Sequence, residues 1–284
     1  MGRVYPIVTI IGTGLLGGSL GLGLKRAGMA GRIRGVGRRQ SPLDTALALG
    51  AIDEASSDPG AAVRDADLVV VCTPAALVIP TLDSIRDAVS SGAIVTDVAS
   101  TKADICAHAE ATWPKPLRFV GSHPMAGSEK FGPEHSTADL YEGTVCLVEE
   151  GGDIDPAARA AVLELWIALG ATVVDIDPAA HDQVVARTSH VPHIAATALS
   201  LLADSGEDVR PFVGNGFRDA TRIADGRPEI WRDICLTNSP AIRGGLAELI
   251  RSLQALSAAI ESGDSAQVES FFERGREARR RVAG

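Results

Sequence analysis

Cysteine is scarce in this sequence of 284 residues, and its four occurrences are far apart. They form no CxxC pair, so the sequence predicts neither a zinc site nor a disulfide framework. Reduced thiols are typical of the cytoplasm, where we expect the protein. The N-terminus also lacks a basic region followed by a signal-type apolar run. The four are Cys72, Cys106, Cys146 and Cys235.

Long apolar runs and an excess of positive charge are absent as well. The longest apolar stretch, at residues 68–80, is interrupted by Thr73 and Pro74 and is too short to span a bilayer. Acidic residues outnumber basic ones by 36 to 27, and the net charge of -9 argues against nonspecific nucleic-acid binding. Only four of the 27 basic residues are lysines, so a lone arginine is weaker evidence of function than usual.

What the sequence does contain is an apolar fraction of 45%, which is enough for two folded domains with large cores. In the first half, β-branched runs alternate with segments of helical spacing, which predicts a parallel, doubly wound α/β sheet. The strands are expected at residues 5–12, 32–39, 66–74 and 93–100, with further strands at 118–122, 144–150 and 171–177. The helices are expected at residues 15–28, 44–50 and 77–92.

The pattern changes near Pro178. From there the sequence has helical periodicity over many turns, with a kink expected at Pro192. We therefore expect an α/β domain over residues 1–177 and an all-α domain over residues 178–284. The all-α domain has more apolar helix faces than a small bundle can bury, so we expect a homodimer formed through it.

A glycine motif follows the first expected strand. Gly12, Gly14 and Gly17 have the spacing GxGxxG between a β-branched strand and a helix, which predicts a Rossmann-type dinucleotide-binding domain. The first glycine allows a tight turn, the second lets the backbone approach the pyrophosphate, and the third lets the helix pack on the strand. The helix N-terminus, at Leu15 and Leu16, offers free N–H groups and a partial positive charge to the diphosphate.

A carboxylate is missing where an NAD site usually has one, at the end of the second strand, to bind the ribose 2′-hydroxyl. The sequence there is GVGRRQS, and Arg38, Arg39 and the hydroxyl of Ser41 suit a 2′-phosphate. We therefore expect NAD(P)+ as the cofactor, with NADP+ preferred. Thr73 and Pro74, at the end of the next strand of the sheet, are expected near the cofactor, although an ordinary strand end explains them equally well.

Three further segments, TDVASTK, GSHPMAG and SHVPH…GFRDATRIADGRPEIWRDI, carry a family resemblance. In order and spacing they resemble the prephenate and arogenate dehydrogenases of tyrosine biosynthesis, and the resemblance runs over about residues 8–242. It implies oxidation and decarboxylation of a cyclohexadienol to a phenol, either 4-hydroxyphenylpyruvate or tyrosine. The two substrates differ only by a keto or an amino group, and the sequence leaves the choice between them open.

By this resemblance, His123 in GSHPMAG is the general base that takes the proton of the ring hydroxyl while hydride leaves for the nicotinamide. Histidine suits this role because its pKa lies near neutrality. Ser100 in TDVASTK is expected to orient the histidine and the hydroxyl. Loss of CO2 then restores an aromatic ring, which drives the reaction forward.

The resemblance assigns substrate binding mainly to the second domain. Arg222 is expected to bind a substrate carboxylate in a bidentate manner. Asp219 is expected to orient Arg222, and Glu129 to gate the pocket through it. His193 is expected to contact the substrate side chain. Trp231 is expected near the ligand, although core packing explains it equally well.

His190 and His193 lie three residues apart, on one face of a helix. No third metal ligand is apparent, so we expect no metal and a structural role for His190. Two other functions remain open. A 3-hydroxyacid or imine reductase would share the plan of domains but usually relies on a lysine or asparagine in the helical domain. A dinucleotide-sensing regulator without catalysis would have no need for Ser100, His123 and Arg222 together.

Overall fold

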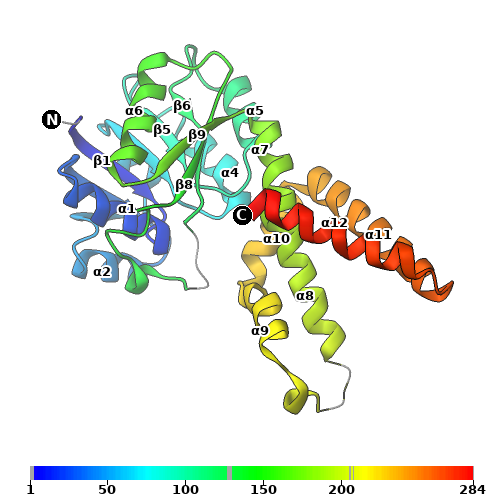
Figure 1. The fold of residues 1–284 in the computed structure, drawn as a ribbon. Coiled ribbons are helices and arrows are strands. Elements are labelled where there is room, and N and C mark those ends of the chain that lie inside the picture. Colours follow the sequence, from blue (N-terminus) through cyan, green and yellow to red (C-terminus); the bar gives the residue numbers. More distant parts are fainter. Residues whose placement is uncertain (1–2, 127–129, 205, 207, 284) are drawn as a thin grey trace.

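The computed structural model describes residues 3–126, 130–204, 206 and 208–283. Its N-terminal part is built on six parallel strands in the order β3-β2-β1-β4-β5-β6 (Figure 1). The chain proceeds outward from β1 on one side and from β4 on the other, which confirms the doubly wound sheet. Ligands of such sheets bind where the strand order reverses, at the carboxyl ends of the central strands. The strands are β1 (Tyr5–Ile11), β2 (Ala30–Val36), β3 (Glu54–Ser56), β4 (Leu68–Val71), β5 (Ile94–Asp97) and β6 (Phe119–Val120).

Helices cover both faces of this sheet, and β4 shows why its strands are continuously apolar. Leu68 and Val70 belong to the core beneath α1, α2 and α6. Val69 and Val71 belong to the core beneath α3, α4 and α5. Because alternate side chains point to opposite faces, all four are buried. The helices are α1 (Leu15–Arg26), α2 (Gln40–Ala48), α3 (Pro59–Ala62), α4 (Ala75–Ile85), α5 (Ala103–Thr112) and α6 (Pro156–Ala168).

The last strands form a separate sheet of three, β7 (Ser122–Pro124), β8 (Val145–Glu149) and β9 (Thr172–Ile176). β7 pairs antiparallel with β8, and β8 pairs parallel with β9. The strand expected at residues 118–122 is therefore divided at Gly121. The Gly121 N–H leaves the β6 ladder and donates to Glu149 Oε2 at 2.8 Å. A Cβ at Gly121 would lie 2.6 Å from Cys106 Sγ, so only glycine fits this crossing between sheets.

The C-terminal part is helical, as expected, but its first long helix is interrupted before Pro192. A π-helical turn at Ala186–His190 joins α7 to α8. Proline lacks the N–H that would bond the carbonyl four residues earlier, so the interruption precedes it. The helices are α7 (Pro178–Val185), α8 (Val191–Ala203), α9 (Asn215–Thr221), α10 (Pro228–Thr237), α11 (Ser239–Glu261) and α12 (Ser265–Ala283). Short 3-10 turns are η1 (Pro133–His135), η3 (Arg210–Phe212) and η4 (Arg222–Asp225).

The helical part extends from the sheet as two arms, one of α8 and α9 and one of α11 and α12 (Figure 1). Its own core is small, with Ala186, Ile234, Ala241 and Ile242 buried together. Many large apolar side chains on these helices stay exposed, which is typical of an interface with a partner. They include Leu199, Leu201, Leu202, Phe212, Leu236, Ile250, Leu253, Ile260 and Phe272. Within the described ranges, the helices lack the combination of length and apolar character needed to cross a membrane.

Candidate active site

The three glycines of the GxGxxG motif have different reasons to be glycine. Gly12 has a φ of +102°, and a Cβ there would lie 2.6 Å from the Cys72 carbonyl oxygen. A Cβ at Gly17 would overlap the Gly12 carbonyl oxygen, so this glycine keeps α1 close to β1. At Gly14, by contrast, a Cβ would meet no described atom within 4 Å. The first and third glycines build the turn, and the second borders open space.

This open space suits a dinucleotide. Gly14 is the N-cap of α1 and supplies no capping side chain, so the N–H groups at Leu15 and Leu16 point toward the opening. The hydroxyl of Thr73, which follows β4, is buried and has no hydrogen-bond partner among the described residues. Pro74 comes next as the N-cap of α4. A buried hydroxyl without a partner is costly unless a ligand completes it.

The residues expected at the ribose lie at the turn between β2 and α2. Arg38, Arg39 and Ser41 are all exposed. In the described part of the chain, no hydrogen bond or ion pair engages either guanidinium. By contrast, Arg34 on β2 pairs with Glu54 and Asp65. The two arginines are therefore free to bind a phosphate.

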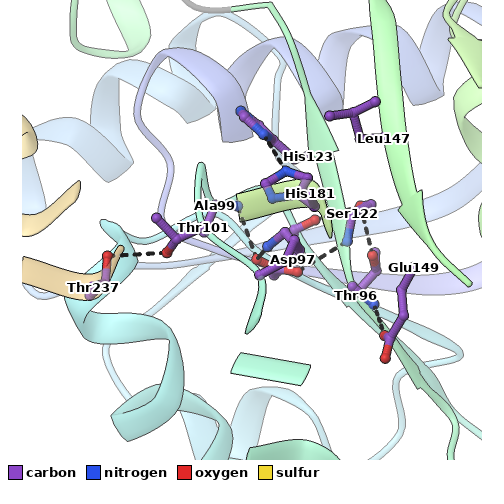
Figure 2. A network of polar contacts seen from close by, with 12 residues as sticks. Thr96, Asp97, Ala99, Thr101, Ser122, His123, Leu147, Glu149, His181 and Thr237 are labelled. Atoms are coloured by element: carbon purple, nitrogen blue, oxygen red, sulfur yellow. Dashed lines mark hydrogen bonds and ion pairs between the residues drawn. The ribbon is translucent and has the colours of Figure 1, made fainter. Parts of the chain in front are cut away.

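A buried polar cluster fixes the strand that carries His123. The Ser122 hydroxyl donates to the Asp97 carbonyl oxygen at 2.6 Å, and the Ser122 N–H donates to Asp97 Oδ1 at 3.2 Å. The Asp97 carboxylate also forms a buried ion pair with the Lys102 ammonium. Figure 2 shows this cluster beside His123. These bonds tie β7 to the carboxyl end of β5, so the backbone at His123 is held rigidly.

His123 is 7% exposed and faces a second histidine from α7. The distance from His123 Nδ1 to His181 Nε2 is 2.9 Å, and the distance from His181 Nδ1 to Asp182 Oδ1 is 2.8 Å. Figure 2 shows the two imidazole rings facing each other. Sequence reasoning missed His181, because a His-Asp pair in a helix is too common a signal and the contact spans 58 positions.

Asp182 also connects the two parts of the chain. Its Oδ1 accepts the N–H of Lys102 at 2.8 Å, and its Oδ2 accepts the N–H of Ala103 at 3.0 Å. The N-cap of α5, Lys102, has no side-chain cap of its own, so a carboxylate from α7 caps this helix. Ser100, half-buried in the loop before α5, makes no side-chain hydrogen bond to a described residue. The side chain that contacts the His123 imidazole in this structure is His181.

The surroundings of His123 favour its neutral form. Burial holds the pKa of His123 well below the ordinary 6.5, and the neighbouring His181, Lys102 and His190 lower it further. A neutral imidazole can accept a proton, whereas an imidazolium cannot. The site therefore offers a base that stays available at neutral pH.

The other two histidines of α7–α8 lie against Trp231. His193 stacks on the indole with ring centroids 3.4 Å apart, and His190 meets it edge-on at 6.1 Å. His190 Nδ1 is 3.3 Å from Asn238 Nδ2. Burial lowers the pKa of His190 to about 4 and also lowers that of His193. Across the described ranges, no group of three or more His, Cys, Asp or Glu side chains could hold a metal ion.

The structure does not bring together the remaining expected residues. Arg222, in η4, and Asp219, in α9, are both exposed. Within the described residues no hydrogen bond or ion pair joins Arg222 to Asp219 or to His123. The expected orientation of Arg222 by Asp219 is thus absent from this single chain. Glu129 lies outside the described residues.

Known proteins resemble this chain over nearly its whole length. A prephenate dehydrogenase of Bacillus subtilis (strain 168) is 31% identical over 277 residues, covering 96% of this chain and 75% of that protein. The crystal structure of A. aeolicus prephenate dehydrogenase with hydroxyphenyl propionate and NAD+ is 30% identical, with a TM-score of 0.90 and 98% of each chain covered. The crystal structure of Synechocystis arogenate dehydrogenase is 29% identical, with a TM-score of 0.82, covering 98% of this chain and 100% of that one.

Two domain families match successive parts of the chain. The nucleotide-binding domain of prephenate dehydrogenase matches residues 20–175, and the dimerization domain of prephenate dehydrogenase matches residues 177–274. The first match begins within α1, after the glycine motif, and the two together take in the buried histidine pair and most of the helical arms. The chain belongs to the prephenate dehydrogenase family.

Proposed function

We propose that this protein catalyses the oxidative decarboxylation of prephenate or arogenate, with hydride transfer to NAD(P)+. The observation that carries the proposal is the buried His123. Its imidazole lies just beyond the carboxyl end of β6, is oriented by His181, and has a pKa well below 6.5. A base of this kind suits a secondary hydroxyl that must lose its proton as hydride leaves the same carbon.

The substrate has the atoms that these side chains can engage. His123 takes the proton of the ring hydroxyl, and Ser100, in the loop after β5, orients that hydroxyl. The bound nicotinamide would accept the hydride from the hydroxyl-bearing carbon. The resulting ring ketone accepts the electron pair left when the ring carboxylate departs as CO2. His123 then returns its proton to the phenolate oxygen, so no net proton is gained or lost.

Substrate recognition is proposed for residues of the second half of the chain. Arg222 binds a carboxylate, and its exposed, unpaired guanidinium in the described structure supports this role. His193 contacts the substrate side chain, and its stacking on Trp231 holds the ring in one orientation. Asp219 and Glu129 remain proposals as residues that orient or gate Arg222. Either carboxylate would favour the ammonium of arogenate.

The proposed cofactor is NADP+ rather than NAD+, because Arg38, Arg39 and Ser41 replace the usual carboxylate after β2. The proposed assembly is a homodimer formed through the helical part, residues 178–284. The exposed apolar side chains of α8 to α12 and the match to a dimerization domain support it.

The proposal is tested by following the reduced nicotinamide in reactions with prephenate and with arogenate, each with NAD+ and with NADP+. We expect turnover of at least one of the substrates. His123→Asn should lower kcat by about 10²–10⁴-fold, the usual contribution of a general base, without weakening cofactor binding. Wild-type protein that turns over neither substrate, or a His123→Asn variant of undiminished kcat, would contradict the proposal.

A further inference from the structure

We infer that His181 and Asp182 are positioning residues that fix the proton of His123 on Nδ1 and so leave Nε2 as the basic nitrogen. This inference rests on the proposed function only in naming His123 as the base. Its evidence is the unbroken chain of contacts from Asp182 Oδ1 to His181 and from His181 Nε2 to His123 Nδ1. All three residues are buried.

The hydrogen bonds from His123 through His181 to Asp182 have a fixed direction, because the carboxylate at the far end can only accept a hydrogen bond. Asp182 receives two backbone N–H groups, from Lys102 and from Ala103, and hydrogen bonds of this kind favour the ionised carboxylate. A carboxylate has no proton to give, so His181 Nδ1 must be the donor in the 2.8 Å contact with Asp182 Oδ1.

The positions of the remaining protons then follow from this donor. A neutral imidazole carries one N–H, so His181 Nε2 has a lone pair and accepts from His123 Nδ1. His123 is then protonated on Nδ1, and its Nε2 keeps the lone pair that a general base needs. The opposite direction would need a cationic His181, and it would put the His123 proton on Nε2.

Charged and titratable neighbours also disfavour positive charge at the His123 end of this chain of contacts. Lys102 and His190 both lie close enough to His123 to disfavour positive charge there. Of the carboxylates described nearby, Asp182 contacts His181 and Asp97 is paired with Lys102. When His123 takes a proton in the reaction, the same chain shares the new charge with Asp182.

Both decisive variants change the chain of contacts but leave the ring of His123 in place. In Asp182→Asn, an amide cannot satisfy Ala103 N–H, Lys102 N–H and His181 Nδ1–H together. With its oxygen at the Oδ1 position, the amide still accepts from Lys102 N–H and from His181 Nδ1–H, but its NH2 meets Ala103 N–H and it carries no charge to balance a protonated His123. We expect kcat to fall by about 10–100-fold with KM nearly unchanged and the His123 tautomer kept, since only the charge at the end of the chain is lost.

His181→Gln leaves Asp182 and its cap of α5 in place, and so covers the case in which Asp182→Asn fails to fold. Its side-chain amide offers His123 both a donor and an acceptor and does not choose between tautomers. We expect kcat to fall by about 10–100-fold, the usual cost of losing the partner that orients an active imidazole. Thr237→Val is the control, because it removes another hydrogen bond between the two parts, the 3.1 Å contact with Thr101 Oγ1. It should leave kcat and tautomer unchanged.

A spectroscopic readout separates this inference from the proposed function. Nitrogen-15 NMR of the full-length, histidine-labelled protein distinguishes Nδ1–H from Nε2–H without substrate, and His123→Asn assigns the signal. We expect Nδ1–H in the wild type and in Asp182→Asn, and a mixture in His181→Gln. Nε2–H in the wild type, or unchanged kcat in His181→Gln, would overturn the inference even with an active enzyme. An inactive wild type with His123 protonated on Nδ1 would instead overturn the proposed function alone.

Discussion

At the scale of single residues, the site is defined by a histidine that burial keeps uncharged. The pKa of His123 is well below 6.5, and burial also lowers that of His190, to about 4, and that of His193. For His123 the neighbouring His181, Lys102 and His190 act in the same direction, whereas Asp182 opposes the shift of His190. Desolvation is the first cause for all three, so the depth of the pocket decides their charge.

This burial gives a testable dependence on pH. A base acts when unprotonated, and a lowered pKa keeps His123 unprotonated as the pH falls through 6.5. We therefore expect kcat/KM to stay level through that pH and to decline only at lower values, whereas an ordinary imidazole loses activity near pH ~6.5. The check is the pH profile of kcat/KM at saturating cofactor. A decline of kcat/KM with its midpoint at or above pH ~6.5, the ordinary pKa of an imidazole, would contradict this prediction.

The sequence singles out His123 as the candidate base but gives no sign of its partner, His181. His123 lies in a segment with a recognisable order of residues, GSHPMAG, whereas His181 lies in a helix whose pattern specifies only which face is buried. What joins the two rings is the packing of α7 against the N-terminal part, and no spacing along the chain encodes it. Arg222 shows the converse: its segment is recognisable in the sequence, although no described residue forms a hydrogen bond or ion pair with it.

At the scale of elements, five of the six strands of the parallel sheet could be predicted, because each is a short apolar run between turn signals. The edge strand β3 was missed, because its three residues, EAS, form no apolar run. The separate sheet of β7, β8 and β9 could not be predicted from the sequence. Its strands at residues 144–150 and 171–177 look like the others, and their place in a second sheet depends on Gly121, where the chain leaves β6 for β7. The π-helical turn at Ala186–His190 could likewise not be predicted from the sequence, because helical periodicity hardly changes over five residues.

The turn between β2 and α2 determines the cofactor prediction. We expect NADP+ to bind more tightly than NAD+, and Arg38→Ala with Arg39→Ala to weaken NADP+ binding by about 10–100-fold, the worth of a charge-assisted hydrogen bond. NAD+ binding should change little. Isothermal titration with both cofactors is the measurement. Arg32→Ala is the matched control, because Arg32 is exposed on the same strand but already paired with Glu54. Tighter binding of NAD+ by the wild type would refute the preference.

At the scale of the whole molecule, the helical arms need a second copy to cover them. Leu202, 77% exposed on α8, is one of the side chains that a homodimer would bury. We expect Leu202→Asp to weaken dimerisation by at least about tenfold, since burying a leucine contributes about 1.5–3 kcal/mol. Sedimentation velocity over a range of concentrations measures this. Ile167→Asp, on an exposed site of α6, should have no effect. A wild type that sediments as a monomer throughout would rule out the dimer.

The cap that Asp182 places on α5 has a consequence for motion between the two parts. Two bonds of this carboxylate join α7 to the start of α5, so separation of the two parts must either break them or turn about them. The amide protons of Lys102 and Ala103 are shielded only while these two bonds stay formed. The rate at which these two amide protons exchange with deuterium therefore reports how often the two halves of the molecule separate at this point.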